Sequence, residues 1–394
     1  MRGAPAGARL TIVLPPCPEE LISSWLVRLA RANALRFQEL ISLISDRRGQ
    51  LLWHDLDTAL PAQSIEAIAR LTARQFDQVA VLQMAERLRA LSLGEQASAF
   101  RWLLQRGART GRPTLPWVQF CTTCLAEDEQ PYLRQEWRLA FVVACNTHGC
   151  PLRDRCPYCG DEFSFHLIDR NRPALTEASP VSICPFCRRD VRLADSMPAA
   201  SKELLEFQAK LMFGWRTGWL PAWNETSWWY AGQCLDVLHR VLAQTNASKR
   251  MQAWFLADVK RQGGAIVLQP GRPFVAWPHS IRLQAMRWLA RAFNGWPKRF
   301  VAGAQRHKLS YADACGEREK LPHWYASTMQ DEVLREWYVP SAEEKDSIAR
   351  YLRRSGASPT FYALRGLLGM YVPASERQPL QLAFPWKVPL DQEQ

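Results

Sequence analysis

Apolar residues recur at helical spacing along most of this 394-residue chain. Near the N-terminus, Leu21, Trp25 and Leu29 share one face of a predicted helix. We expect this helix to begin at Pro18, with acidic residues in its first turn, where carboxylates suit the positive end of the helix dipole. A second short helix is predicted over 37–44. Two short helices across a tight turn are typical of a helix-turn-helix, although any αα-hairpin gives the same pattern.

The rest of the pattern predicts a mainly α fold with a small β component. Amphipathic helices are expected within 61–106, whereas the mostly apolar run 136–143 predicts a strand that leads into a cysteine-rich region. After Pro198 the chain is expected to be helical to its end. We interpret the many tryptophans of this part as core residues rather than as a base-stacking platform. The last two predicted helices, over 341–354 and 358–368, again resemble a helix-turn-helix.

Length and pattern together predict more than one domain, because a chain of this size exceeds a single compact core. We expect a helical N-terminal domain over 1–118, which begins with the helix-turn-helix-like pair. A tandem zinc-ribbon-like module is predicted over 119–195. A helical C-terminal domain, with the second helix-turn-helix-like pair, is predicted over 196–394.

The cysteine-rich region contains four pairs of metal-binding residue types, each pair separated by two residues. The pairs are Cys121 and Cys124, Cys145 and His148, Cys156 and Cys159, and Cys184 and Cys187. The two-residue gap lets both side chains of a pair face one ion from a tight turn, and two pairs complete a tetrahedron. The spacing therefore predicts two structural zinc ions per chain, one held by the first two pairs and one by the last two.

The cysteines also allow other interpretations of the ligands and of the bound metal. Cys150 lies two residues after His148 and is an alternative ligand in the first set. A catalytic zinc keeps an open position beside three protein ligands, whereas both sets here are complete at four. An iron–sulfur cluster would prefer four thiolates, which only the second set offers. No secretory signal or membrane-spanning run is evident, so we expect a cytoplasmic protein in which Cys17, Cys150, Cys234 and Cys315 are free thiols.

The chain is strongly basic, with a formal net charge of +12 and a sequence pI near 9.4. This balance favours polyanionic partners, above all nucleic acid, although a solvated basic surface is the alternative. The arginines that we predict as nucleic-acid or partner contacts are Arg28, Arg31, Arg350, Arg353, Arg354 and Arg365.

A series of motifs accompanies the metal-binding pairs. It consists of Pro18-Glu19-Glu20-Leu21, Ser24-Trp25, Arg28-Leu29-Ala30, Cys121-x-x-Cys124, Trp137-Arg138, Cys145-x-x-His148-Gly149, Cys156-Pro157-x-Cys159-Gly160 and Trp296-Pro297-x-x-Phe300. In this order the motifs resemble the TniQ/TnsD family, the target-selection proteins of multi-subunit transposons. The resemblance extends over 12–310.

The resemblance implies a non-enzymatic adaptor that recognises a target and recruits an AAA+ ATPase regulator, which in turn brings in the transposase. Some members of the family bind CRISPR effector complexes as homodimers, and others bind DNA themselves. Neither case is favoured by this sequence.

Two classes of protein remain as alternatives. One is a zinc-ribbon or helix-turn-helix transcription regulator that binds DNA without transposase partners. The other is a phosphoryl-transfer enzyme, which would need converging carboxylates for Mg²⁺. The carboxylates available near the cysteines are Asp154, Asp161, Glu162 and Asp190. We expect them to be surface charges, and no phosphate-cradling Walker motif is present, so we predict no catalytic residues.

Overall fold

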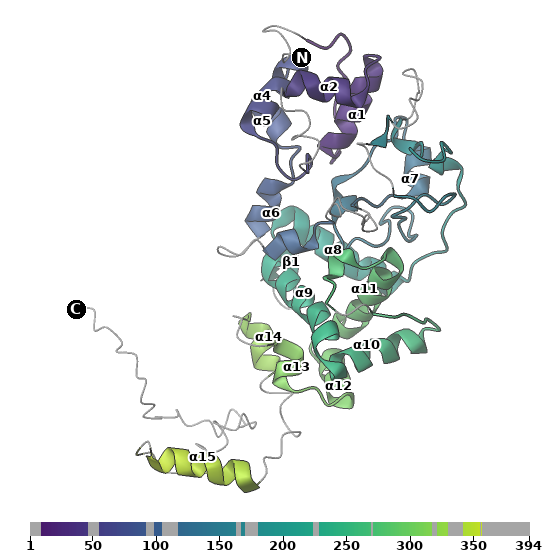
Figure 1. Cartoon of the computed structure of the whole chain (residues 1–394). Coiled ribbons are helices and arrows are strands. Elements are labelled where there is room, and N and C mark those ends of the chain that lie inside the picture. The colour runs from purple at the N-terminus through teal and green to yellow at the C-terminus, as the bar shows by residue number, and fades with distance from the viewer. Residues whose placement is uncertain are drawn as a thin grey trace, which may run out of the picture. The chain divides into compact units, whose positions relative to one another are not determined.

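The computed structural model of the chain is shown in Figure 1. It describes residues 9–45, 55–91, 98–104, 117–162, 167–169, 180–223, 228–268, 271–316, 321–329, 342–354 and 356. Packing divides the chain into two units. Unit 1 comprises Met1–His239 and Gly271–Arg291, and unit 2 comprises Arg240–Pro270 and Ala292–Gln394. The predicted boundaries at 118 and 195 stay a prediction.

The mainly helical fold class is confirmed. The α-helices are α1 (Ile22–Ala32), α2 (Phe37–Ile44), α4 (Ala62–Leu71), α5 (Phe76–Ala80), α6 (Ala85–Leu91), α7 (Thr122–Glu127), α8 (Lys202–Thr217), α9 (Ala231–Ala247), α10 (Lys249–Arg261), α11 (His279–Phe293), α12 (Lys298–Arg306), α13 (Tyr311–Cys315), α14 (His323–Thr328) and α15 (Ala342–Arg354). Short 3₁₀ helices are η1 (Ser98–Trp102), η2 (Gln135–Arg138), η4 (Pro180–Ser182), η5 (Val191–Leu193) and η6 (Phe274–Ala276). Among the described residues, no helix is long and apolar enough to cross a membrane.

The first helix begins later than predicted. It starts at Ile22, and its first turn holds no acidic residue, so the predicted start at Pro18 is wrong. The residues before it are instead held by a distant segment. The backbone N–H of Leu21 donates to the carbonyl of Leu133 at 2.9 Å, and the carbonyl of Glu19 accepts from Gln135 at 2.8 Å. This tertiary pairing replaces the first helical turn that local sequence favours.

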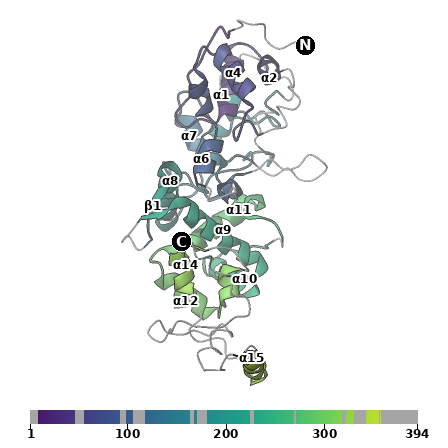
Figure 2. The same ribbon diagram turned by 90° about the vertical axis from the view of Figure 1, so that its left-hand side faces the viewer.

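The predicted helical pair is present, because α1 packs against α2. The apolar face of α1 forms part of the core, and Leu21, Trp25 and Leu29 are all 0% exposed. Figure 2 shows α1, α2 and α4 grouped at the N-terminal end of unit 1. The structure therefore has an αα-hairpin at the predicted place, and a DNA-reading role for it stays a prediction.

The segment 136–143 does not form the predicted strand. Its start is the 3₁₀ helix η2, and among the buried residues after it Leu139 forms only an isolated antiparallel bridge with Leu103. Two glutamine side chains satisfy further backbone groups of the segment. Gln119 donates to the carbonyls of Leu139 and Val142, at 3.2 and 2.9 Å. The side-chain carbonyl of Gln208 accepts from Val143 at 2.8 Å. The apolar run therefore predicted correctly that the segment is buried, but the predicted β-strand is wrong.

A short β-hairpin interrupts the region predicted to be helical. Strand β1 (Trp219–Pro221) pairs antiparallel with β2 (Trp228–Tyr230), with Trp219 opposite Tyr230. Gly218 ends α8 with a φ of 84°, a left-handed conformation that glycine adopts without strain. Aromatic residues suit a pleated surface as well as a helix face, so their spacing alone did not separate the two elements.

The end of the chain is described only in part. Helix α15 lies at the predicted place. The second helix of the predicted pair, over 358–368, lies outside the described residues, as does Arg365.

Candidate metal centres and their surroundings

The first candidate metal centre gathers four side chains in unit 1. The donor atoms of Cys121, Cys124, Cys145 and His148 all lie within 4.8 Å of one another. The sulfur of Cys124 is 3.5 Å from the sulfur of Cys145 and 3.2 Å from Nδ1 of His148. The same nitrogen lies 3.5 Å from each of the sulfurs of Cys121 and Cys145.

The second candidate centre is built from thiols alone. The sulfurs of Cys156, Cys159, Cys184 and Cys187 also lie within 4.8 Å of one another. Cys156 and Cys187 are 3.7 Å apart, as are Cys159 and Cys184. Cys159 is exposed, whereas Cys156 and Cys184 are buried.

These separations fit tetrahedral coordination of one ion at each centre. With metal–sulfur bonds of about 2.3 Å and a metal–nitrogen bond of about 2.05 Å, a tetrahedron has sulfur–sulfur edges of about 3.8 Å and sulfur–nitrogen edges of about 3.6 Å. The sulfur–sulfur distances of 3.5 and 3.7 Å and the sulfur–nitrogen distances of 3.2 and 3.5 Å lie close to these edges. Both clusters can therefore hold a metal ion.

Three of the four ligand pairs are presented by the same kind of turn. The residue before the first ligand forms an isolated antiparallel bridge with the residue seven positions later, which joins Ala144 to Pro151, Arg155 to Glu162, and Ile183 to Asp190. The residue after the second ligand has a positive φ, which is 62° at Gly149, 75° at Gly160 and 61° at Arg188. The left-handed residue closes the turn so that both ligands face the same side. The duplicated spacing in the sequence thus corresponds to a repeated local structure.

The fourth ligand pair uses a helix end instead of this turn. Cys121 is the N-cap of α7, and its sulfur accepts the backbone N–H of Cys124 at 3.5 Å. Hydrogen bonds from Cys124 and then Cys145 lower the pKa of the Cys121 thiol. A thiolate at this position also suits the positive end of the helix dipole. The N-terminus of α7 therefore favours the charge state that a metal needs in its ligand.

Glu127, which the sequence reasoning missed, supports the histidine of the first centre. It is the last residue of α7, and its Oε2 lies 2.8 Å from Nε2 of His148. When Nε2 donates its proton to this carboxylate, the lone pair of Nδ1 faces the sulfurs. The sequence could have indicated this role, because Glu127 follows the ligand Cys124 by three residues and so lies on the same side of a short helix.

Cys150 lies beside the first centre without joining its set of mutual neighbours. Its sulfur is 3.8 Å from the sulfur of Cys121. The donors that lie within 4.8 Å of one another nevertheless include His148 and not Cys150. The geometry therefore favours His148 as the fourth ligand.

Arg28, which we predicted as a nucleic-acid or partner contact, lies in the interior. Its side chain is 6% exposed and donates to Glu20 at 2.5 Å and to Gln130 at 2.6 Å. Glu20 is itself fully buried and also accepts from the hydroxyl of Ser24 at 2.8 Å. Burial raises the pKa of Glu20, and the Arg28 guanidinium opposes this shift. The pairing favours a structural role for Arg28, and its contact with nucleic acid or a partner stays a prediction.

Arg31 is buried in the same way and joins distant parts of unit 1. Its guanidinium donates to Asp169 at 2.5 Å and to the carbonyl of Leu35 at 3.0 Å. The second oxygen of Asp169 accepts the backbone N–H of Phe37, the first residue of α2, at 2.7 Å. A carboxylate from between the third and fourth metal-binding pairs thus binds the end of α1 and the start of α2. Sequence periodicity carried no signal for a partner so far away in the chain.

A buried charge cluster around Arg138 was also missed. Arg138 is 0% exposed and donates to Asp55 at 2.5 Å and to Asp57 at 2.9 Å. Asp57, also 0% exposed, accepts from both the backbone N–H and the hydroxyl of Ser23 in α1. The guanidinium carbon of Arg138 lies 4.4 Å from the centre of the Trp117 ring. Through this cluster the segment that precedes Cys145 is tied to the first helix.

The remaining predicted residues are dispersed. Arg350, Arg353 and Arg354 are exposed on α15. Of the carboxylates weighed as Mg²⁺ ligands, Asp154 pairs with Arg282 and Asp190 pairs with Arg192. Within the described ranges, the groups of metal-binding donors that lie together are the two cysteine-rich clusters.

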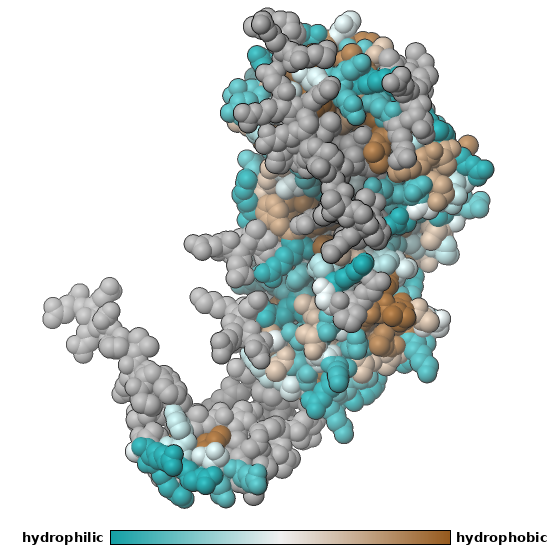
Figure 3. Space-filling view, viewed as in Figure 1, coloured by the Kyte–Doolittle hydropathy of each residue, from teal (hydrophilic) through white to brown (hydrophobic). Residues whose placement is uncertain are grey.

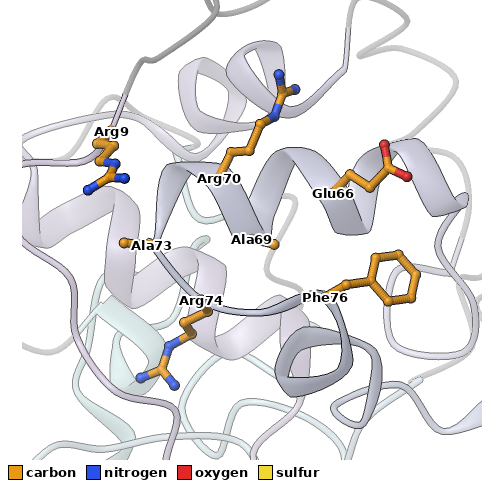
Figure 4. Close-up of a pocket in the computed structure, with 7 residues that line it drawn as sticks. All are labelled: Arg9, Glu66, Ala69, Arg70, Ala73, Arg74 and Phe76. Atoms are coloured by element: carbon orange, nitrogen blue, oxygen red, sulfur yellow. The ribbon is translucent and has the colours of Figure 1, made fainter.

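Figure 4 shows a shallow hollow of about 680 Å³ beside α4. It is lined by Arg9, Glu66, Ala69, Arg70, Ala73, Arg74 and Phe76. In the figure, Arg70 and Glu66 project from the helix while Arg74 lies below it, so the three arginines do not converge on one point. The hollow is open and is lined by both polar and apolar side chains, and we assign it no ligand.

Comparison with known proteins bears on the N-terminal half of unit 1. The comparison with curated proteins found no match. Residues 11–152 match a family model described as TniQ. The matched segment includes α1, the buried ion pairs of Arg28 and Arg138, and all four ligands of the first centre. The predicted resemblance to the TniQ/TnsD family is thereby confirmed for residues 11–152, the part of the chain that matches the family model.

Proposed function

We propose that the chain is a non-enzymatic target-selection adaptor of DNA transposition. The observation that supports this most directly is the TniQ match, which covers a segment folded around the first metal centre. On this proposal the chain links target DNA, or a DNA-bound complex such as a CRISPR effector, to an AAA+ ATPase regulator and so indirectly to the transposase. A homodimer is part of the proposal where the target is a CRISPR complex.

We further propose that both centres bind structural zinc. Four thiolates, or three thiolates and one imidazole, form the ligand sets that zinc prefers when it has no open position. The ions would hold the turns of residues 121–187 in place, where the described residues form one short α-helix and short 3₁₀ helices. Free thiolate ligands require reducing conditions, which supports a place in the bacterial cytoplasm.

Metal binding would also order the N-terminal helices. The segment between the first two ligand pairs contacts residues 19–21 through backbone hydrogen bonds and Asp57 through Arg138. Loss of the first ion would release this segment and remove its support from α1. The adaptor surface of the TniQ domain would then depend on zinc even if no partner touches the ion.

The experiment that tests the function is a pull-down of the zinc-loaded protein with the candidate AAA+ ATPase and target DNA. The expected result is recovery of the ATPase, with recovery lost in a Cys121→Ser variant that lacks the first ion. A protein that binds DNA but recovers no ATPase would contradict the adaptor function and favour a DNA-binding regulator.

A further inference from the structure

Unit 2 carries a cluster of cations at the ends of two neighbouring helices. Lys260 and Arg261 end α10, Arg306 ends α12, and His307 and Lys308 follow it directly. We call these five residues the α10/α12 basic patch. His307 is half-buried, and the other four residues are exposed. In Figure 3, the surface where these two helices lie in Figure 1 carries hydrophilic residues next to a hydrophobic area.

A close helix crossing brings the two ends together. The indole of Trp254 in α10 lies against Gly303 of α12, where a Cβ would come within 2.2 Å of the indole ring. The ring of His307 stacks on Trp254, with 6.2 Å between the ring centres and 19° between the planes. Burial, Arg306 and Arg261 together lower the pKa of His307, which means that cations from both helices act on the same imidazole. The crossing thus brings the ends of α10 and α12 together, with Arg261 and Arg306 both acting on His307.

The charge of this patch is not neutralised within the described part of unit 2. Residues 240–268 and 292–316 contain nine lysines and arginines and only two acidic residues, Asp258 and Asp313. Asp258 pairs with Arg261 at 3.0 Å, and Asp313 pairs with Arg250 at 3.3 Å. Over the residues that the structure describes, neither Lys260, Arg306 nor Lys308 has a carboxylate partner. Like charges held this close repel one another unless a polyanion is bound.

Lys308 also has a left-handed backbone conformation that glycine would adopt more easily. Its φ is 51°, and Leu309 donates to the carbonyl of Ala304 at 2.9 Å, which closes the end of α12. At the matching position after α10 stands Gly263, with a φ of 71°. Glycine adopts this left-handed conformation without strain, whereas lysine does not. This left-handed residue places Lys308 directly after Arg306 and His307 at the end of α12.

Cations at helix C-termini also complement the helix dipole, and that is the structural alternative. The helix dipole explains one cation at each helix end. It does not explain a patch in which Lys260, Arg306 and Lys308 have no carboxylate partner among the described residues. The patch has no free helix that could enter a groove, because α10 and α12 pack on each other through Trp254 and Gly303. Helix ends with long cationic side chains suit contacts to phosphates, which carry no sequence information.

We propose that the α10/α12 basic patch binds the phosphate backbone of duplex DNA without reading its sequence. The choice of DNA as the polyanion rests on the proposed function in transposition. The patch lies outside residues 11–152, so it would add a DNA contact to a chain whose family match ends in unit 1. Non-specific backbone contacts of this kind would hold the adaptor on DNA on either side of a recognised target.

The test is a triple variant, Lys260→Ala, Arg306→Ala and Lys308→Gly, in the full zinc-loaded protein. The Lys308→Gly change removes a charge and relieves the left-handed strain at the same position, so it should not weaken the fold. Affinity for a fluorescent duplex of mixed sequence is measured by anisotropy between about 50 and 200 mM salt. If each side chain contacts one phosphate, the slope of log affinity against log salt should fall by about 2.7 in magnitude, and affinity at about 0.1 M salt by about 500-fold.

A charge-matched control is Arg9→Ala, Arg70→Ala and Arg89→Ala, which removes three exposed cations from unit 1. The proposal requires that this control keep nearly all of the DNA affinity and salt slope. An equal loss in the control would show that net charge alone drives binding and would overturn the assignment. So would wild-type affinity in the patch variant, or tighter binding of a single-stranded RNA or of polyglutamate than of the duplex.

Recruitment of the ATPase, measured in the same preparations without DNA, separates the two proposals. A patch variant that keeps both DNA affinity and ATPase recruitment contradicts the patch and leaves the adaptor function standing. A wild-type protein that recruits no ATPase contradicts the adaptor function, whereas a steep salt slope lost only in the patch variant still supports the patch.

Discussion

Replacing Arg138 with methionine tests whether the buried charge cluster holds the metal-bearing segment against the N-terminal helices. Methionine fills a similar volume without a charge, so the change removes the pairing and leaves most of the packing. Asp57 would remain 0% exposed with only the hydrogen bonds from Ser23. Removing one partner of a buried ion pair costs about 3–5 kcal/mol. Asp55, whose side chain is 29% exposed, can rehydrate and adds little to this loss.

The loss in free energy of unfolding caused by Arg138→Met should depend on pH because of Asp57. Its pKa is raised to about 6, since burial disfavours the carboxylate more than Arg138 stabilises it. A raised carboxyl pKa means that the native state binds more protons than the unfolded state between about pH 4 and pH 6. The stability that protonation contributes is therefore present below this range and is lost as the pH rises through about 6. Without Arg138 the pKa rises further, so the variant should lose more stability at about pH 7.5 than at about pH 5.5.

Urea denaturation of the zinc-loaded proteins at both pH values measures these differences. A second variant that carries Arg138→Met together with Asp57→Asn should recover much of the stability at the higher pH, because no buried charge is left unpaired. The reasoning fails if the double variant is no more stable than Arg138→Met alone. It also fails if the deficit of Arg138→Met is the same at both pH values.

The remaining predictions concern the metal centres and the first helix. Protein purified without chelator should contain two zinc ions per chain by metal analysis, and Cys121→Ser should contain one; a wild-type content of one or none would contradict the two-site assignment. Glu127→Gln should weaken zinc binding at the first centre about 10- to 100-fold in chelator competition, because His148 loses the carboxylate that orients it; an unchanged affinity would mean that Glu127 plays no such role. Arg28→Met should lower the free energy of unfolding by about 3–5 kcal/mol, because Glu20 is left buried and unpaired; unchanged stability with lost partner binding would instead support the surface role that we predicted from the sequence.

The metal centres were predictable from the sequence because their geometry is local. The two ligands of each pair are separated by two residues, and three of the pairs close with the same bridge and the same left-handed residue. Each centre combines two ligand pairs that are neighbours in the sequence. The loop between them is short, which limits the combinations of pairs that can share one ion. The helices α2, α10 and α15 were likewise predictable, because each shows its own periodic apolar face.

The charged interior could not be predicted, because periodicity reports which face of a helix is polar but not what covers that face. Arg28 and Arg31 lie off the apolar stripe of α1, and this position predicted exposure. Their partners Gln130 and Asp169 are 102 and 138 residues away in the chain, in segments shaped by the metal-binding turns. A buried arginine and a solvated one have the same local sequence pattern.

This difference changes how the net charge of +12 should be interpreted. Arginines such as Arg28, Arg31 and Arg138 are matched by buried carboxylates, so they contribute to the fold and not to the field that attracts a polyanion. The charge available for nucleic acid must come from exposed cations such as Lys260, Arg306 and Lys308, which have no carboxylate partner among the residues that the structure describes. A basic sequence therefore predicts the class of partner, whereas only the pairing within the structure indicates which residues are free to meet it.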